Sequence, residues 1–208
     1  MRNTRAPYEL ILVDDGSIDN SYLYFRTITS KAIRSRINRG VPFSRNLGLA
    51  VADGDLIVFI DNDVVVHPGW LSKLITESQN ANVGIIGYIP TDESYKLQYP
   101  RSADGLIDVY EIAGACLGVT REAFDRTGFF DKNLRFVNDD TDYCFRTYLN
   151  GFRVTLIPEL IQHNPHRTVS IDKKNESRPY FWEKWGDTWI CKAAFPHLKW
   201  DGKKLISI

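Results

Sequence analysis

Asp55-Leu56-Ile57-Val58-Phe59-Ile60-Asp61-Asn62-Asp63 is the stretch around which the rest of the chain is organised. Its five consecutive apolar residues, rich in β-branched and aromatic side chains, predict a strand that is buried on both faces. Such strands are typical of parallel sheets covered by helices, and ligands bind these sheets at the carboxyl ends of the strands. The stretch therefore predicts an α/β fold with a binding site where Asp61 and Asp63 lie.

Asp61 and Asp63 are separated by one residue at the point where the apolar strand stops. Two carboxylates brought together there are unfavourable unless a cation neutralises them. Ligand sets made only of oxygen suit a hard divalent ion such as Mg²⁺ or Mn²⁺. A polar turn that ends the strand is the alternative, and these residues alone leave both interpretations open.

Composition and charge limit the class of protein. With 208 residues, the chain is long enough for one α/β domain and short for two. Basic and acidic residues number 26 each, and this zero net charge argues against nucleic acid as the main partner. The three cysteines have no CxxC spacing, which indicates reduced thiols in a cytoplasmic protein. No stretch approaches about 18 consecutive apolar residues, so no membrane span is predicted.

Strands and helices are predicted on both sides of the opening stretch. Apolar runs predict strands over 8–13, 32–37, 83–89, 112–119 and 152–157. Periodic patterns and capping residues predict helices over 21–30, 44–52, 68–79, 120–126 and 138–150, with Ser44 as the cap of the second. Residues 90–110 form a long polar and aromatic excursion, which is typical of functional or disordered segments.

Charged residues mark two further element ends. Asp14 and Asp15 follow the first predicted strand, where they can form a turn or contact a ligand. Arg45 falls in the first turn of its helix, on the unfavourable side of the helix dipole. A facing anion, such as a phosphate or these two carboxylates, explains a cation there, while a solvated surface arginine stays open.

A third acidic group opens the helix predicted over 138–150. One acid at a helix N-terminus is stabilising, but Asp139, Asp140 and Asp142 lie within four residues and repel one another. Asp142 can pair with Arg146 at i,i+4. The other two are left for capping, metal binding or catalysis. His163, after the last predicted strand, is a structural group or, near carboxylates, a metal ligand.

Residues 169–208 form an aromatic C-terminal extension with four of the five tryptophans. We expect this extension to pack on the domain formed by residues 1–168 or on a second copy, which would make a homo-oligomer. Aromatic side chains also stack on sugar rings, so an acceptor surface is the alternative use.

Taken in order, these motifs resemble those of family 2 glycosyltransferases of the GT-A fold. The matching stretches are 9–21, 38–48, 54–63, 114–131 and 139–151. The resemblance implies a single-domain, Rossmann-like, mostly parallel sheet flanked by helices. It also implies an enzyme that moves a sugar from a nucleotide-diphosphate-sugar to a glycan or other hydroxyl acceptor, with inversion, in polysaccharide or glycoconjugate synthesis. Retention of configuration stays open.

The resemblance assigns donor-side roles to five of the residues above. Asp14 and Asp15 would hold the nucleoside, with Arg45 beside it. Asp61 and Asp63 match the DxD motif, which binds the nucleotide-sugar together with Mn²⁺ or Mg²⁺, and Asp63 is the firmer metal ligand.

Acceptor-side roles follow from the same resemblance. Asp140 would be the catalytic base, and Asp139 would help to position the acceptor. The family usually has Glu where this chain has Asp139, so the side chain is one methylene shorter. His163 matches a downstream histidine that binds the metal in some relatives.

The N-terminal region departs from the family pattern. Family members begin with a further strand, which lies between the strand ending at Asp14 and the strand ending at Asp61. Buried backbone groups without partners cost about 1–3 kcal/mol each. We therefore expect residues 204–208, or a partner chain, to fill that position.

Two other functions compete with glycosyl transfer. The first is a non-catalytic, nucleotide-sugar-binding relative that lost its first strand. The second is a nucleotidyltransferase, because a related sheet in that class also uses paired aspartates and Mg²⁺. The chain lacks a glycine-rich, lysine-bearing first loop, which counts against the second.

Overall fold

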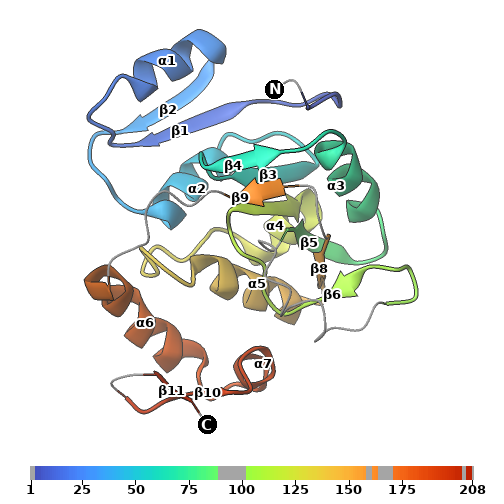
Figure 1. Ribbon diagram of the computed structural model, residues 1–208, viewed down its shortest axis with the longest axis vertical. Helices are drawn as coiled ribbons and strands as arrows, with labels where there is room; N and C mark the ends of the chain where they lie inside the picture. The colour runs from blue at the N-terminus through green and yellow to red at the C-terminus, as the bar shows by residue number, and fades with distance from the viewer. Residues whose placement is uncertain (1–2, 89–101, 158–160, 164–170, 203–204, 208) are drawn as a thin grey trace.

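The computed structural model describes residues 3–88, 102–157, 161–163, 171–202 and 205–207 (Figure 1). The helices are α1 Ser21–Ile28, α2 Val41–Leu49, α3 Trp70–Ser78, α4 Arg121–Thr127, α5 Asp139–Leu149, α6 Ile171–Trp185 and α7 Trp189–Ala194. The strands are β1 Ile11–Asp15, β2 Lys31–Ser35, β3 Leu56–Ile60, β4 Val64–Val66, β5 Val83–Gly87, β6 Ile107–Asp108, β7 Cys116–Thr120, β8 Arg153–Leu156, β9 Ile161–His163, β10 Leu198–Trp200 and β11 Leu205–Ser207.

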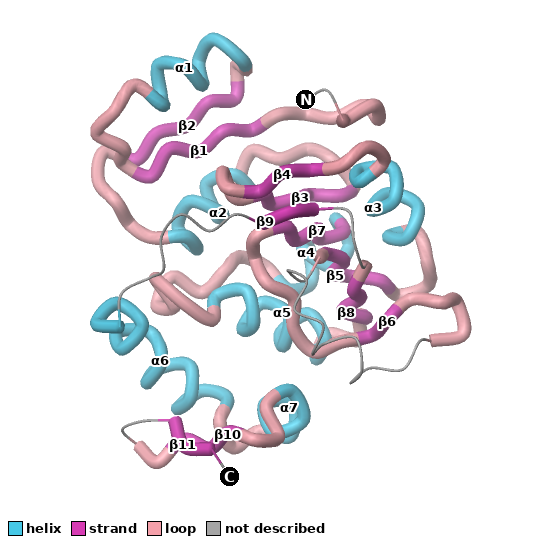
Figure 2. The backbone as a smooth tube through the Cα atoms, in the orientation of Figure 1, coloured by secondary structure: helices cyan, strands magenta, loops and turns pink. Residues whose placement is uncertain are grey.

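Five strands form the central sheet, in the order β3-β7-β5-β8-β6 (Figure 2). The prediction of an α/β fold with a sheet flanked by helices is confirmed. The expectation of a mostly parallel sheet is wrong, because only β5 and β8 run parallel and the other three pairings are antiparallel. An apolar run reports that a strand is buried but does not report its direction, so the sequence pattern could not distinguish the two.

The organising strand β3 lies at the edge of this sheet. It pairs with β7, and no second strand pairs with it among the described residues. Ile57 is buried, whereas Ile60 is 42% exposed. Leu56 and Val58 pack against one hydrophobic cluster, and Ile57 and Phe59 pack against the other. Both faces of β3 are therefore covered as expected, although most of its residues are only partly buried.

Two hydrophobic clusters cover the two faces of the sheet. On one face, Trp70, Leu71 and Leu74 of α3 pack against β5 residues, so the apolar face predicted for this helix lies on the core. On the other face, residues of α4 and α5, including Ala123 and Tyr143, pack with β5, β7 and β8. The central sheet is therefore the rigid frame on which the neighbouring loops are mounted.

The N-terminal layer, residues 11–35, is a separate parallel pair of strands, β1 and β2, joined by α1. No residue of α1 is buried. Helix α2, which packs on β1, connects the N-terminal layer to the rest of the molecule. Helix α2 begins after Gly40 rather than at the predicted cap Ser44, because Pro42 suits a first helical turn that needs no N–H donor.

The C-terminal extension packs on α5 at the opposite end of the molecule from β1 and β2 (Figure 1). Phe181, Trp182 and Trp185 of α6 share a buried cluster with Phe145 of α5. Residues 205–207 pair with β10 there. The expectation that this segment fills the position between β1 and β3 is therefore wrong. The predicted boundary between the domain and the C-terminal extension, at residues 168 and 169, lies outside the described residues.

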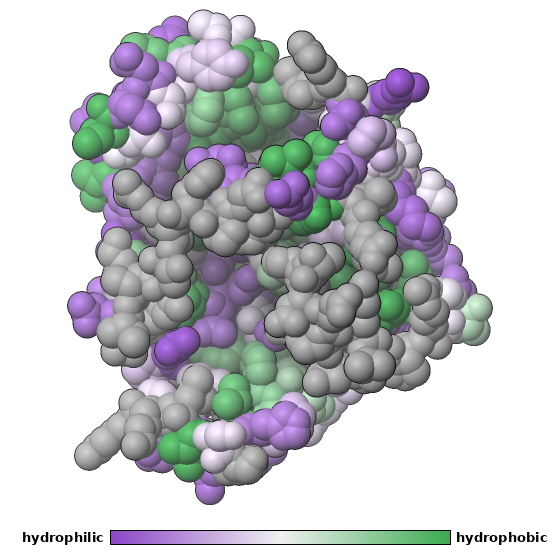
Figure 3. Space-filling model, viewed as in Figure 1, coloured by the Kyte–Doolittle hydropathy of each residue, from purple (hydrophilic) through white to green (hydrophobic). Residues whose placement is uncertain are grey.

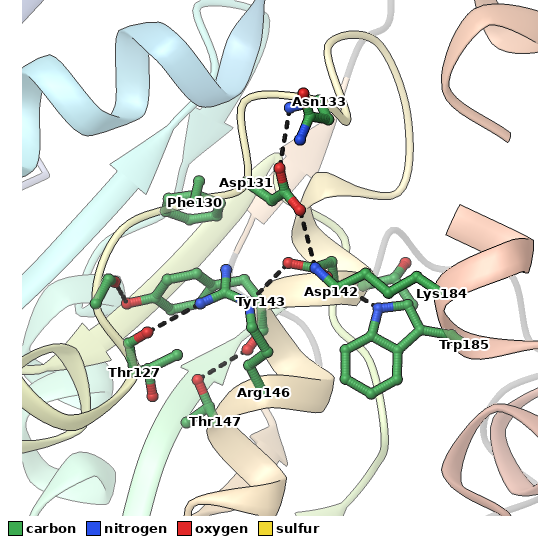
Figure 4. Close-up of polar contacts among 12 residues, drawn as sticks. Thr127, Phe130, Asp131, Asn133, Asp142, Tyr143, Arg146, Thr147, Lys184 and Trp185 are labelled. Atoms are coloured by element: carbon green, nitrogen blue, oxygen red, sulfur yellow. Dashed lines mark hydrogen bonds and ion pairs between the residues drawn. The ribbon is translucent and has the colours of Figure 1, made fainter. Parts of the chain in front are cut away.

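A polar network fastens α6 to α5 (Figure 4). The Asp142 carboxylate accepts hydrogen bonds from Arg146 Nε at 2.8 Å and from Trp185 Nε1 at 2.9 Å, and Lys184 Nζ lies 2.7 Å away. The predicted pairing of Asp142 with Arg146 is thus confirmed. Lys184 also contacts Asp131 at 2.9 Å, so one lysine ties together two acidic residues of the domain.

No helix in the described part of the chain combines the length and the apolar character that crossing a membrane requires.

Candidate functional site

A cleft of about 890 Å³ lies between β1 and β3, with α2 along one side. Its lining includes the strand backbones of 11–15 and 57–61 together with Arg45 of α2 and Phe136. Four residues predicted to bind the donor, namely Asp14, Asp15, Arg45 and Asp61, line this cleft. Its volume falls in the range of about 300–1,000 Å³ that is usual for small-molecule sites.

Asp14 and Asp15 hold the loops beside the cleft. The buried Asp14 carboxylate accepts from Ser17 N at 2.8 Å and lies 3.2 Å from Arg34 Nε. Asp15 accepts from Gly40 N at 2.8 Å and from Arg39 N at 3.0 Å, so it fixes the start of α2. The turn chemistry is present, and both carboxylates still border the cleft, so the ligand role stays a prediction.

The Asp61–Asp63 turn joins β3 to β4. Asp61 N donates to Ala115 O at 3.0 Å, and Val64 N closes the turn on Asp61 O at 3.2 Å. The antiparallel pairing of β4 with β9 places His163 opposite Val64, one residue from Asp63. Thus the backbone brings the three predicted metal ligands to one end of β3.

Metal binding itself stays a prediction. Within the described residues, no three His, Cys, Asp or Glu side chains gather closely enough to form a metal centre. The Asp61 side chain is 46% exposed on the cleft, and carboxylate oxygens are the donors that Mg²⁺ and Mn²⁺ prefer. Sites for these ions complete their coordination with waters and substrate phosphates, so two carboxylates fit this kind of site.

Arg45 joins the donor side of the site to the acidic start of α5. Its Nη1 donates to Asp139 Oδ2 at 2.7 Å, its Nη2 donates to Gly114 O at 2.9 Å, and Nη2 lies 3.9 Å from Asp61. The side chain is only 8% exposed. The sequence predicted a facing anion for this cation; the structure supplies Asp139 and Asp61 rather than Asp14 and Asp15.

The acidic pair that opens α5 has two different environments. Asp139 is buried and paired with Arg45; burial raises the pKa of its carboxyl, and the cation opposes that rise. Asp140 is partly exposed, and its carboxylate accepts from Gly114 N at 2.7 Å and from Thr141 N at 2.8 Å. Asp139 is therefore held inside, while Asp140 is fixed by backbone donors nearer the surface.

Glu111 is a site residue that sequence reasoning missed. Thr141 Oγ1 donates to Glu111 Oε2 at 3.0 Å, immediately beside Asp140. Burial and then the charge of Asp140 raise the pKa of Glu111 to about 7. Its only signal in the sequence was its position, three residues before Gly114 in a small-residue segment, and no motif marked it.

Known proteins resemble this chain in sequence. The family model described as glycosyl transferase family 2 matches residues 1–153. The glycosyltransferase EpsJ of Bacillus subtilis is 24% identical over 228 residues, which cover 92% of this chain and 66% of EpsJ. Protein y4gI of Sinorhizobium fredii is 27% identical over 197 residues, which cover 78% of this chain. The chain spans only 22% of y4gI, so it matches part of a longer relative.

Solved structures share the fold at low sequence identity. One is the mannosyltransferase PcManGT of Pyrobaculum calidifontis in complex with GDP-Man and Mn²⁺. It has a TM-score of 0.67 at 16% identity, and the match covers 91% of this chain and 60% of the PcManGT chain. S. aureus TarS 1-349 in complex with UDP-GlcNAc has a TM-score of 0.62 at 15% identity, covering 90% and 62%. With the family model matched over 153 residues, the chain belongs to glycosyl transferase family 2.

Proposed function

We propose that the chain is a metal-dependent, inverting glycosyltransferase that moves a sugar from a nucleotide-diphosphate-sugar to an acceptor hydroxyl, in polysaccharide or glycoconjugate synthesis. The observation that carries the proposal is the position of Arg45. This one buried cation lies 3.9 Å from Asp61 on the donor side and 2.7 Å from Asp139 on the acceptor side. One buried arginine therefore links two acidic groups that are distant in the sequence, and we assign one group to the donor and the other to the acceptor.

The donor is assigned to the cleft between β1 and β3. Its nucleoside would lie near Asp14 and Asp15, and its diphosphate near Asp61. PcManGT and TarS, which share the fold, are complexed with GDP-Man and UDP-GlcNAc, and this likeness supports a donor of the same class. A divalent ion held by Asp61, Asp63 and His163 would offset the charge that develops on the leaving diphosphate.

The chain's own residues would supply proton transfer and positioning. A sugar hydroxyl is a poor nucleophile at neutral pH, so a carboxylate must take its proton. Asp140 is the candidate base, because its carboxylate is fixed by Gly114 N and Thr141 N at an accessible helix start. Asp139, held by Arg45, would set the position of Asp140 and of the acceptor. Inversion requires this base to act on the face opposite the leaving group.

A transfer assay on the purified chain tests the proposal. Nucleotide-sugars are supplied with Mn²⁺, and release of nucleoside diphosphate is measured with simple glycosides as acceptors. We expect Asp140→Asn to lower turnover by roughly 10²–10⁴-fold. Thermal-shift titration should show that the variant still binds the donor. Glu122→Gln, on the exposed surface of α4, is the matched control and should retain full turnover.

The outcomes separate the competing functions. Donor binding without transfer by the unaltered chain would favour the non-catalytic relative. Release of pyrophosphate would indicate a nucleotidyltransferase. If no nucleotide-sugar binds or is turned over across the panel, the proposal is wrong.

The cellular environment proposed for the protein is the cytoplasm. The buried, free thiols of Cys116, Cys144 and Cys191 agree with such a reducing environment.

A further inference from the structure

Glu111 and Asp140 are joined through one residue, Thr141. The Thr141 hydroxyl donates to Glu111 Oε2 at 3.0 Å, and the Thr141 backbone N–H donates to Asp140 Oδ1 at 2.8 Å. Gly114 N, three residues after Glu111, donates to the other oxygen of Asp140 at 2.7 Å. The segment that carries Glu111 and the first turn of α5 therefore hold the two carboxyl groups as one unit.

The two carboxyl groups have unequal surroundings. Asp140 receives two backbone N–H donors, whereas Glu111 is held by a single hydroxyl. The titratable groups that act on Glu111 are the Asp140 carboxylate and the thiols of Cys144 on α5 and Cys191 on α7. Burial raises the pKa of both thiols well above neutrality, so they stay uncharged.

The C-terminal extension packs against the residue beside Glu111. Tyr110, adjacent to Glu111, packs its ring against Trp189 of α7 with 6.3 Å between centroids, and against Tyr148 of α5 with 5.5 Å. Glu111 is thus partly buried beside α5, and Asp140 is the neighbouring carboxylate whose charge raises its pKa. A carboxyl group that is partly buried beside another carboxylate keeps its proton to a higher pH than usual.

We propose that Glu111 is a positioning residue that acts through Asp140 and sets the pH range in which Asp140 serves as the base. The inference rests on the proposed function. In the transfer step the acceptor O–H bond breaks, its proton goes to Asp140, the acceptor oxygen bonds to the anomeric carbon, and the electron pair of the broken C–O bond leaves with the diphosphate. An ionised Glu111 places a second negative charge beside Asp140, and this charge favours the arrival of the acceptor proton during the transfer step.

The pH dependence of kcat/KM for the acceptor tests this inference. The unaltered chain should show a rise centred near pH 7, which matches the pKa of Glu111, about 7. Glu111→Gln removes the titrating group, so we expect the rise in kcat/KM to disappear. At pH values above the rise, turnover should fall roughly 3- to 10-fold. Glu111→Asp should restore a rise. Thr141→Val removes a hydrogen bond that lowers the pKa of Glu111, so it should move the rise to higher pH.

Carbon-13 NMR of the glutamate carboxyl groups gives a readout that does not need activity. The Glu111 signal is identified by its absence in Glu111→Gln and should titrate near pH 7. Asp140→Asn removes the neighbouring charge, so the Glu111 midpoint should move to lower pH. A merely structural Glu111 would not couple to Asp140 in this way.

Each result bears on a different claim. If the unaltered chain transfers sugar and Glu111→Gln keeps the same rise, the titrating group is another one, such as Asp139, and the inference is overturned. If the unaltered chain transfers no sugar, the proposed function fails, and the NMR titration alone decides the coupling. A Glu111 midpoint that Asp140→Asn leaves unmoved overturns the inference whatever the activity.

Discussion

The N-terminal layer and the α5 cluster, which is the packing of α5 with the C-terminal extension, differ in how completely they are buried. In the N-terminal layer and its helix α1, Ile18, Leu23 and Tyr24 are exposed. Green apolar atoms lie on the surface at the top of Figure 3, where this layer lies. In the α5 cluster, Phe145 and Phe181 are fully buried. The predicted donor residues Asp14 and Asp15 thus belong to a weakly packed layer, while the acidic pair of α5 belongs to a rigid core.

This difference indicates how the two halves of the site would respond to ligands. Regions with few buried apolar contacts open at low free energy, and ligand sites are often found in such regions. A donor bound in the cleft would contact both β1 and β3, so it would hold the layer against the central sheet. The acidic pair needs no such ordering, because Arg45 and two backbone donors already fix it.

The largest contrast is expected from truncating one apolar side chain in each region. Phe181→Ala empties a fully buried position of the α5 cluster and should lower the free energy of unfolding by roughly 4 kcal/mol. Leu23→Ala on α1 is the matched change, and because Leu23 is 58% exposed it should cost about 0.5 kcal/mol. Urea unfolding of both variants measures the difference. Equal losses would show that the layer is as well packed as the core.

The second contrast concerns the ion pair that links the regions. Arg45→Met leaves Asp139 buried without its cation and should cost roughly 3 kcal/mol. Adding Asp139→Asn in the same chain should recover much of that loss, because the uncompensated charge is removed. Thermal unfolding of the two variants measures both values. If the double variant is no more stable than Arg45→Met, the pair contributes through packing and not through charge.

The parts of the site that the sequence could predict are those marked by local chemistry. Acids at the ends of β1 and β3 and at the start of α5 follow from apolar runs, turn residues and caps, and the structure places them at those positions. The pairing of Arg45 with Asp139 could not be predicted, because it depends on how α2 crosses the segment containing Gly114. Glu111 was missed for the same reason: its surroundings come from α5 and α7, which are distant in sequence.

Glycine substitutions beside the two regions, one next to β1 and one next to the start of α5, should have opposite effects on stability. A β carbon at Gly114 would overlap the Arg45 guanidinium, so Gly114→Ala should displace that side chain and cost about 2 kcal/mol. Gly48 lies within α2, and the nearest atom to its β carbon would be Val13 Cγ2 at 3.8 Å, an ordinary contact. Gly48→Ala should therefore gain about 0.5–1 kcal/mol from helix propensity. Thermal unfolding at one pH checks both; a stabilised Gly114→Ala would contradict the close approach of Arg45.

The smallest expected effect is a pH dependence of stability with opposite sign in the two regions. The pKa of Glu111 rises on folding from 4.5 to about 7, so its contribution is fully present below pH 4.5 and is lost as the pH rises through about 7. The full shift corresponds to about 3 kcal/mol. Because Glu111 is only partly buried, solvent screening should reduce the loss of stability relative to Glu111→Gln to roughly 1–2 kcal/mol across this window. Glu9 precedes β1, and its carboxylate accepts a hydrogen bond from Asp53 N and pairs with Lys31. These two interactions lower the pKa of Glu9. Its contribution is present above pH 4.5 and is lost as the pH falls through the lowered value, so Glu9→Gln should converge with the unaltered chain in acid. Urea unfolding of the three proteins across pH separates the two slopes, and slopes of the same sign would mean that the surroundings of Glu111 do not raise its pKa.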